Sequence, residues 1–169
     1  MNDRHNWEPA SSTPEYLSAA GAAMVKQLAP ATVAGKPKPV WLNQGGWMFH
    51  YPWWMHGDTN TTGKGVRVYN YLSKVPAEQV LILELSADRG PTVYDFDYAP
   101  DLASPYRSDY WGKHWVWCLL HNYGQRPGVY GNLSQVATSP AASLAASGST
   151  MTGIGISPEG IEQNPVVSA

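Results

Sequence analysis

The feature that most constrains the fold is a near-continuous apolar run at residues 79–85, Q-V-L-I-L-E-L. A strand that is buried on both faces shows such a run instead of strict alternation, and this is typical of parallel sheets. Similar short apolar segments occur at residues 40–43, 114–120 and 150–156. We therefore predict four parallel strands.

Helical segments separate most of these strands. The first begins near Thr13, which is suited to the N-cap position, with Pro14 at the first helical position, and ends near Ala29. The remaining predicted segments are a helix at 66–75, a short helical or turn segment at 128–136, a small helix at 140–147, and a long aromatic loop at 48–65.

Alternation of helices and strands at this spacing predicts a parallel α/β fold. Four strands cannot close an eight-stranded barrel. We therefore predict that residues 1–169 form a single partial domain, a partial (β/α)8 TIM barrel with about four parallel strands alternating with helices. An open parallel sheet is the alternative.

One acidic residue, Glu84, interrupts the apolar run of the clearest strand. A carboxylate inside such a strand costs several kcal/mol unless it is paired or points into a polar site. We therefore expect Glu84 to have a partner. Asp88 follows past the expected strand end, and a surface turn is one of two open accounts of it.

Polar residues follow the ends of three predicted strands, and the carboxyl ends of parallel strands meet at one edge, where (β/α) barrels place catalytic groups. Glu159 follows the fourth strand, which Pro158 ends because proline supplies no ladder donor. Alternatively, Glu159 caps the next helix. The other candidates are Trp47, which is otherwise a core residue, His121, which otherwise bonds its own loop, Asn122, which otherwise supplies a left-handed turn, and Tyr123.

Three ungapped blocks carry a family resemblance: W-L-N-Q-G-G-W-M-F at 41–49, W-C-L-L-H-N-Y-G at 117–124 and S-P-E-G-I-E-Q-N-P-V-V at 157–167. Together they resemble the α-N-acetylglucosaminidases of glycoside hydrolase family 89, over residues from about Asn6 to Val167. The resemblance implies the second half of that family's catalytic TIM barrel. It also implies retaining hydrolysis of terminal α-linked N-acetylglucosamine from glycans, with no cofactor.

The resemblance also assigns residues. Glu159 falls on the nucleophile, and Trp47 and Tyr123 fall on aromatic positions that line the sugar site. His121 and Asn122 match residues of the same edge, and we place Glu84 among the substrate-binding residues. The general acid/base of the family is the glutamate of an Asn-Glu pair. Here Trp7 follows Asn6, so Glu8 matches only with a shift of one residue.

Other departures concern the two ends of the sequence. Ser168 follows Val166 and Val167, where the family often has tyrosine, and only five residues precede Asn6. We therefore expect the isolated chain to have little or no activity. The alternative to a glycosidase fragment is a non-catalytic carbohydrate-binding or remnant protein.

Composition excludes some classes of partner. Charged residues make up 14% of the chain and its net charge is -2, which argues against a nucleic-acid partner, since such proteins need a basic face. No apolar run is long enough for a transmembrane helix, so we expect no membrane partner. The 8 Trp and 10 Tyr against 2 Phe fit sugar stacking or a Trp-rich core.

Cysteine and aspartate usage limits other chemistry. The single cysteine, Cys118, permits no intrachain disulfide, and its apolar surroundings predict burial. Four aspartates lie between residues 91 and 112 without a D-x-D-x-D-G calcium loop, so we predict no metal site. The resemblance implies an extracellular or lysosomal/vacuolar location, although the N-terminus lacks the apolar core of a signal peptide.

Overall fold

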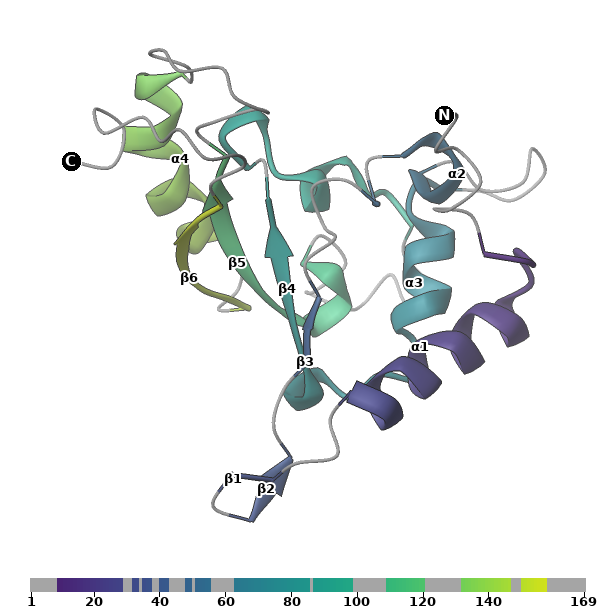
Figure 1. The fold of residues 1–169 in the computed structure, drawn as a ribbon. Helices are drawn as coiled ribbons and strands as arrows, with labels where there is room; N and C mark the ends of the chain where they lie inside the picture. Colours follow the sequence, from purple (N-terminus) through teal and green to yellow (C-terminus); the bar gives the residue numbers. More distant parts are fainter. Residues whose placement is uncertain are drawn as a thin grey trace, which may run out of the picture.

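The computed structural model describes residues 9–28, 32–33, 35–37, 40–42, 48–49, 51–55, 63–85, 87–98, 109–120, 132–146 and 150–157. At its centre lies a parallel sheet of four strands in the order β3-β4-β5-β6 (Figure 1). The strands are β3 (Val40–Leu42), β4 (Val80–Glu84), β5 (His114–Leu119) and β6 (Met151–Ile156). Each lies within one residue of its predicted ends, so the prediction of a parallel α/β sheet is confirmed.

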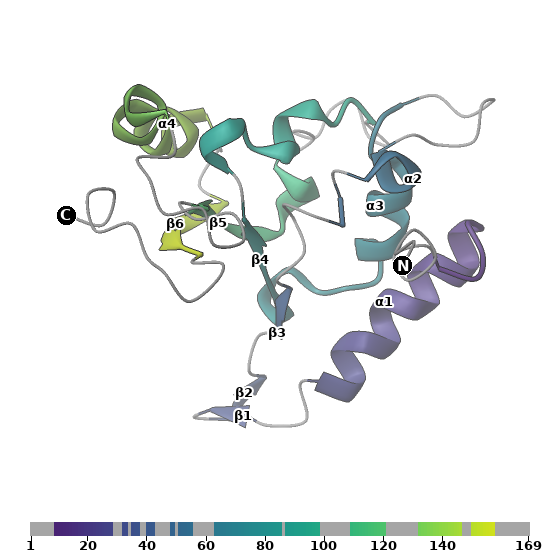
Figure 2. The ribbon, with the colours of Figure 1, turned by 45° about the horizontal axis from the view of Figure 1, so that its top comes forward.

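Two helices pack together beside β3 and β4, namely α1 (Pro14–Leu28) and α3 (Val66–Leu72) (Figures 1 and 2). The helices approach each other so closely that a Cβ atom on Gly21 would lie 1.9 Å from the Tyr71 carbonyl oxygen. A short helix, α2 (Pro52–Met55), lies within the segment predicted as a long loop and packs against α3. The described part of that segment is therefore partly helical, which corrects the prediction.

The helix before β6 is longer than predicted. Helix α4 (Leu133–Ala146) runs without interruption through Pro140, where we predicted two separate segments. Proline removes one helical hydrogen bond and disfavours the helical conformation of the residue before it. Tertiary packing outweighs this cost, because Pro140 and Ser143 are buried and the Trp117 indole N–H donates to the Ser139 hydroxyl at 3.2 Å.

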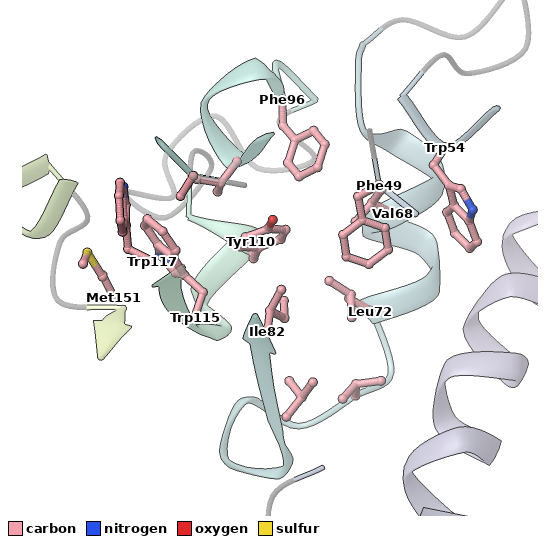
Figure 3. Packing of buried hydrophobic residues seen from close by; sticks show 14 of the residues in the cluster. Phe49, Trp54, Val68, Leu72, Ile82, Phe96, Tyr110, Trp115, Trp117 and Met151 are labelled. Carbon is pink, nitrogen blue, oxygen red and sulfur yellow. The ribbon is translucent and has the colours of Figure 1, made fainter. Parts of the chain in front are cut away.

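The hydrophobic core lies on the face of the sheet that carries α3 and α4, which we call the helix-covered face (Figure 3). Alternate residues of β4 and β5 point to this face and are fully buried, among them Ile82, Trp115 and Trp117. They pack with residues from the helices and loops, including Phe49, Val68, Leu72, Phe96 and Tyr110. Trp54, Trp115 and Trp117 are therefore core residues, as the Trp-rich core interpretation predicts.

The pairing of β5 with β6 contains a β-bulge. Trp115 pairs with Met151, but the next residue of β5, Val116, pairs with Gly153, so Thr152 is the extra residue. A bulge leaves one residue out of the ladder. Here the Thr152 hydroxyl donates to the Trp115 carbonyl oxygen at 3.2 Å, which satisfies a carbonyl beside the irregularity.

Smaller elements connect the rest. A hairpin of two-residue strands, β1 (Thr32–Val33) and β2 (Lys36–Pro37), turns at Gly35 with a φ of 76° where we predicted a loop. The part of the chain that the structure describes also contains the short 3-10 helices η2 (Ala77–Gln79), η3 (Ala87–Arg89), η4 (Thr92–Asp95) and η5 (Tyr110–Gly112). Within the described ranges, no helix has the length and apolar character needed to cross a membrane.

Candidate active site at the C-terminal edge of the sheet

The C-terminal ends of the parallel strands bring distant parts of the sequence to one edge. Glu84 ends β4, Leu120 follows β5 directly, and Ser157 follows β6 directly. His121 is the residue after Leu120, and Glu159 is the second residue after Ser157. The described strand ends therefore place Leu120 and Ser157, which directly precede the two predicted blocks in the sequence, at the edge where barrel enzymes carry their chemistry.

Of the predicted site residues, the structure describes Glu84. The others lie outside the described residues: Glu8, Trp47, His121, Asn122, Tyr123 and Glu159.

The ends of β5 and β6 are tied together. Beyond the last paired residues, the Ser157 N–H donates to the Leu119 carbonyl oxygen at 2.8 Å. A Cβ atom on Gly155 would lie 3.0 Å from Cys118 Sγ, so the strands approach closely just before this bond. Cys118 is buried, as predicted, and burial raises the pKa of its thiol. This tie fixes the point from which the chain leads to Glu159.

The ends of β4 and β5 are joined through Asp88, in η3. Its side chain is 4% exposed, and its Oδ1 accepts a hydrogen bond of 3.4 Å from the Leu120 backbone N–H. Burial raises the pKa of Asp88, while that hydrogen bond and the charge of Arg89 act in the opposite direction. The surface-turn account of Asp88 is therefore wrong. Sequence reasoning missed the contact between Asp88 and Leu120. The signal that could have indicated it is the position of a carboxylate just past the end of a buried strand.

Glu84 has the partners that its burial requires, so that prediction is confirmed. Its side chain is fully buried, and its carboxylate accepts hydrogen bonds from the Thr92 hydroxyl at 2.8 Å and from the Tyr110 hydroxyl. Burial, and then the charge of Glu84, raises the pKa of Tyr110 well above its usual value, so Tyr110 stays a donor. The carboxylate lies on the helix-covered face, beneath the edge. Direct contact between Glu84 and a sugar stays a prediction.

A third buried carboxyl, Asp109, lies at the opposite end of the sheet. It precedes β5 and lies beside Thr150, which precedes β6. Its side chain is 2% exposed, and within the described residues its Oδ1 has no hydrogen-bond partner. Burial raises the pKa of Asp109 to about 6, although the polar groups of the Thr150 and Trp115 side chains lower it. This group is thus separate from the candidate active site.

An apolar hollow of about 570 Å³ opens between α4 and β6. It lies on the helix-covered face and is lined by Val136, Ala137, Pro140, Ala141, Leu144, Met151, Thr152, Gly153 and Ile154. Sugar sites need several polar groups to orient hydroxyls, and Thr152 is the one polar side chain in this lining. The hollow is therefore not a candidate for the sugar site.

Comparison with known proteins supplies the remaining evidence. Residues 1–169 match the family model described as alpha-N-acetylglucosaminidase (NAGLU) tim-barrel domain. The chain is 34% identical to human alpha-N-acetylglucosaminidase over 160 residues, which cover 95% of this chain and 18% of the human protein. The chain thus spans about a fifth of the length of this relative.

Solved structures are similar as well. A family 89 glycoside hydrolase from Clostridium perfringens in complex with PUGNAc is 30% identical, with a TM-score of 0.47, covering 61% of this chain and 10% of that one. A form of the enzyme from the same organism in complex with its substrate GlcNAc-alpha-1,4-galactose is 30% identical, with a TM-score of 0.44, covering 59% and 10%.

Proposed function

Because this chain belongs to the family of the alpha-N-acetylglucosaminidase TIM-barrel domain, we propose that it is the second half of a retaining α-N-acetylglucosaminidase barrel. The chain is a partial (β/α)8 barrel with four described parallel strands. The proposed substrate is a glycan that ends in α-linked N-acetylglucosamine. The observation that carries this proposal is the family match over residues 1–169, which includes the S-P-E-G block around Glu159.

In the proposed reaction, Glu159 attacks the anomeric carbon and forms a covalent glycosyl-enzyme while the glycosidic C–O bond breaks. An upstream glutamate, Glu8 in this proposal, donates a proton to the leaving oxygen. It then takes a proton from the water that hydrolyses the intermediate. Retaining enzymes hold the two carboxyl groups about 5–5.5 Å apart. The tie between Ser157 and Leu119 supports the role of Glu159, because it holds the strand end that precedes this residue.

We propose that the end of β5 supplies the sugar-binding groups. His121 and Asn122 would hydrogen-bond hydroxyl groups, and Tyr123 would stack on a sugar ring together with Trp47 from beyond β3. The parallel order β3-β4-β5-β6 supports this grouping, because every one of these residues follows the C-terminal end of a strand. Glu84 would contribute to the same site from the end of β4.

The share of the relative that the chain covers, 18%, leads us to propose the activity for the whole barrel and little hydrolysis for these 169 residues alone. The proposed location is extracellular or lysosomal/vacuolar, as the family resemblance implies.

The experiment that tests this function measures binding and hydrolysis separately. We expect N-acetylglucosamine to bind the chain weakly, in about the millimolar range, in NMR titrations that report on Leu120 and Ser157. An aryl α-N-acetylglucosaminide tests hydrolysis, with Glu159→Gln as the matched variant.

Each outcome has a distinct meaning. Hydrolysis that is lost in Glu159→Gln establishes catalysis and contradicts the expected inactivity of the chain alone. Binding that survives Glu159→Ala, without hydrolysis by the parent, supports a non-catalytic carbohydrate-binding protein instead. A chain that neither binds nor hydrolyses contradicts the proposed function.

A further inference from the structure

The end of β5 makes two bonds to neighbouring elements through consecutive residues. The Leu119 carbonyl oxygen accepts from the Ser157 N–H at 2.8 Å, toward β6. The Leu120 N–H donates to Asp88 Oδ1 at 3.4 Å, toward η3, which follows β4. Three strand ends are therefore joined in sequence by one backbone bond and one side-chain bond.

The hydrogen bond between Leu120 and the Asp88 side chain is buried. Asp88 is 4% exposed and Leu120 is 3% exposed. A buried backbone N–H beyond the end of a ladder needs an acceptor, because it has lost its hydrogen bonds to water and gains none in return. Asp88 supplies this acceptor from a position 32 residues earlier in the chain.

We propose that Asp88 is a positioning residue of the active site, which fixes the end of β5 between the ends of β4 and β6. The inference rests on the proposed function, since it is the family's chemistry that places a sugar at this edge. Asp88 touches no reacting atom in this account. It acts through Leu120, from which the chain leads into His121, and through Leu119, which holds the strand that leads to Glu159.

The chain offers a matched control in Asp97. Its carboxylate accepts a hydrogen bond from the Lys64 backbone N–H, which is the same kind of long-range tie made in another loop. Asp88→Ala and Asp97→Ala each remove one long-range bond from a backbone N–H to a carboxylate, which is buried at Asp88 and exposed at Asp97. Asp88→Asn keeps an oxygen that can accept from Leu120.

The experiment measures amide hydrogen exchange by NMR and the binding of N-acetylglucosamine in these three variants of the full chain. In Asp88→Ala we expect exchange at Leu120 to accelerate about tenfold or more, with weaker acceleration at Ser157 and none at Lys64. Sugar affinity should fall about tenfold. Asp88→Asn should restore both, and Asp97→Ala should accelerate exchange at Lys64 while leaving affinity within about twofold.

Two results would overturn the proposal. One is unchanged exchange at Leu120 and Ser157 in folded Asp88→Ala. The other is an equal loss of affinity in Asp88→Ala and Asp97→Ala, since a general loss of stability would explain it. If the parent chain binds no sugar, the proposed function fails by itself. The role of Asp88 at the strand end is then still decided by the exchange rates.

A measurement on the unmodified chain covers the case in which Asp88→Ala does not fold. The amide proton resonance of Leu120 should shift as the carboxyl of Asp88 titrates, and Asp88→Asn should abolish this shift. A Leu120 resonance that is the same in both proteins across the titration would contradict the contact on which the proposal rests.

Discussion

The two ends of the parallel sheet both bury carboxyl groups, but they treat them differently. At the C-terminal end, Glu84 and Asp88 accept hydrogen bonds from Thr92, Tyr110 and the Leu120 backbone. At the N-terminal end, Asp109 is buried as completely, yet its Oδ1 has no partner in the described structure and its pKa is raised to about 6. Carboxylates thus join elements at one end and remain incompletely satisfied at the other.

The backbone shows the same contrast. Tyr110 and Trp111, which follow Asp109, have positive φ values of 49° and 51°, a region that non-glycine residues rarely adopt. This conformation carries the Tyr110 side chain through the core to Glu84 near the other end of the sheet. The residue with this uncommon backbone conformation at the N-terminal end is therefore the one whose hydroxyl donates to Glu84 near the C-terminal end, where the chemistry is proposed.

The largest expected effect comes from breaking the C-terminal end at Glu84. Glu84→Ala leaves the buried hydroxyls of Thr92 and Tyr110 without this acceptor and opens a cavity. The free energy of unfolding should fall by about 3–5 kcal/mol. Urea unfolding at pH 7 measures the change.

The control for this change is Glu84→Gln, which retains an acceptor and should cost less than half as much. A double-mutant cycle with Tyr110→Phe then isolates the pair. A coupling energy near zero would show that Tyr110 does not depend on Glu84, and the link between the two ends of the sheet would be lost.

At the N-terminal end, Asp109→Asn should change the pH dependence of stability. The pKa of Asp109 is about 6 in the folded chain, whereas its ordinary value, which applies to the unfolded chain, is 3.8. Between these two pH values the folded state therefore binds more protons than the unfolded state. The contribution of Asp109 to stability therefore falls as pH rises from about 4 to 7, by about 2 kcal/mol. The amide side chain of the variant stays neutral, so the difference in unfolding free energy between pH 5 and pH 7 should shrink.

Thr150→Val provides the opposite test at the same site. The Thr150 hydrogen bond lowers the pKa of Asp109, so its removal should raise that pKa and steepen the loss of stability above pH 5. Unfolding curves measured from pH 4 to 8 compare the three proteins. Parallel curves for Asp109→Asn and the parent would contradict the titration of Asp109.

The smallest expected effect concerns the bulge near the start of β6. Thr152→Val keeps the shape of the side chain and removes the hydroxyl that donates to the Trp115 carbonyl. We expect the free energy of unfolding to fall by about 0.5–1 kcal/mol. Thr138→Val removes a comparable bond to Ser134 on the exposed surface of α4 and should cost less. Equal losses would show that the bulge needs no support from this hydroxyl.

The sequence predicted the sheet well, because apolar runs such as residues 79–85 are strong local signals and parallel pairing follows from their alternation with helices. It failed at α4, where Pro140 and its neighbours suggested a break. The contact between Trp117 and Ser139 that supports this helix joins residues 22 apart, and no local pattern contains it.

For the candidate site, the sequence correctly predicted that Glu84 needs partners, and it left Asp88 open between a surface turn and a role at the edge. A carboxylate within an apolar strand must have partners, and this argument needs only the strand itself. The identity of those partners, Thr92 and Tyr110, depends on how two later loops fold back. Burial of Asp88 likewise depends on β5, which lies far along the chain.

The extra residue in β6, Thr152, determines how the residues after it pair with β5. Side chains in a strand alternate between the two faces, so the bulge at Thr152 sets which face each later residue points to. If Thr152 instead paired with Val116 as an ordinary ladder residue, Ile154 and Ile156 would turn from the helix-covered face to the other, and Ser157 would shift out of step with Leu119. In the evolution of this chain, the loss of a residue between Gly153 and Ile156 is therefore more disruptive than the loss of Thr152 itself, which would leave a regular ladder.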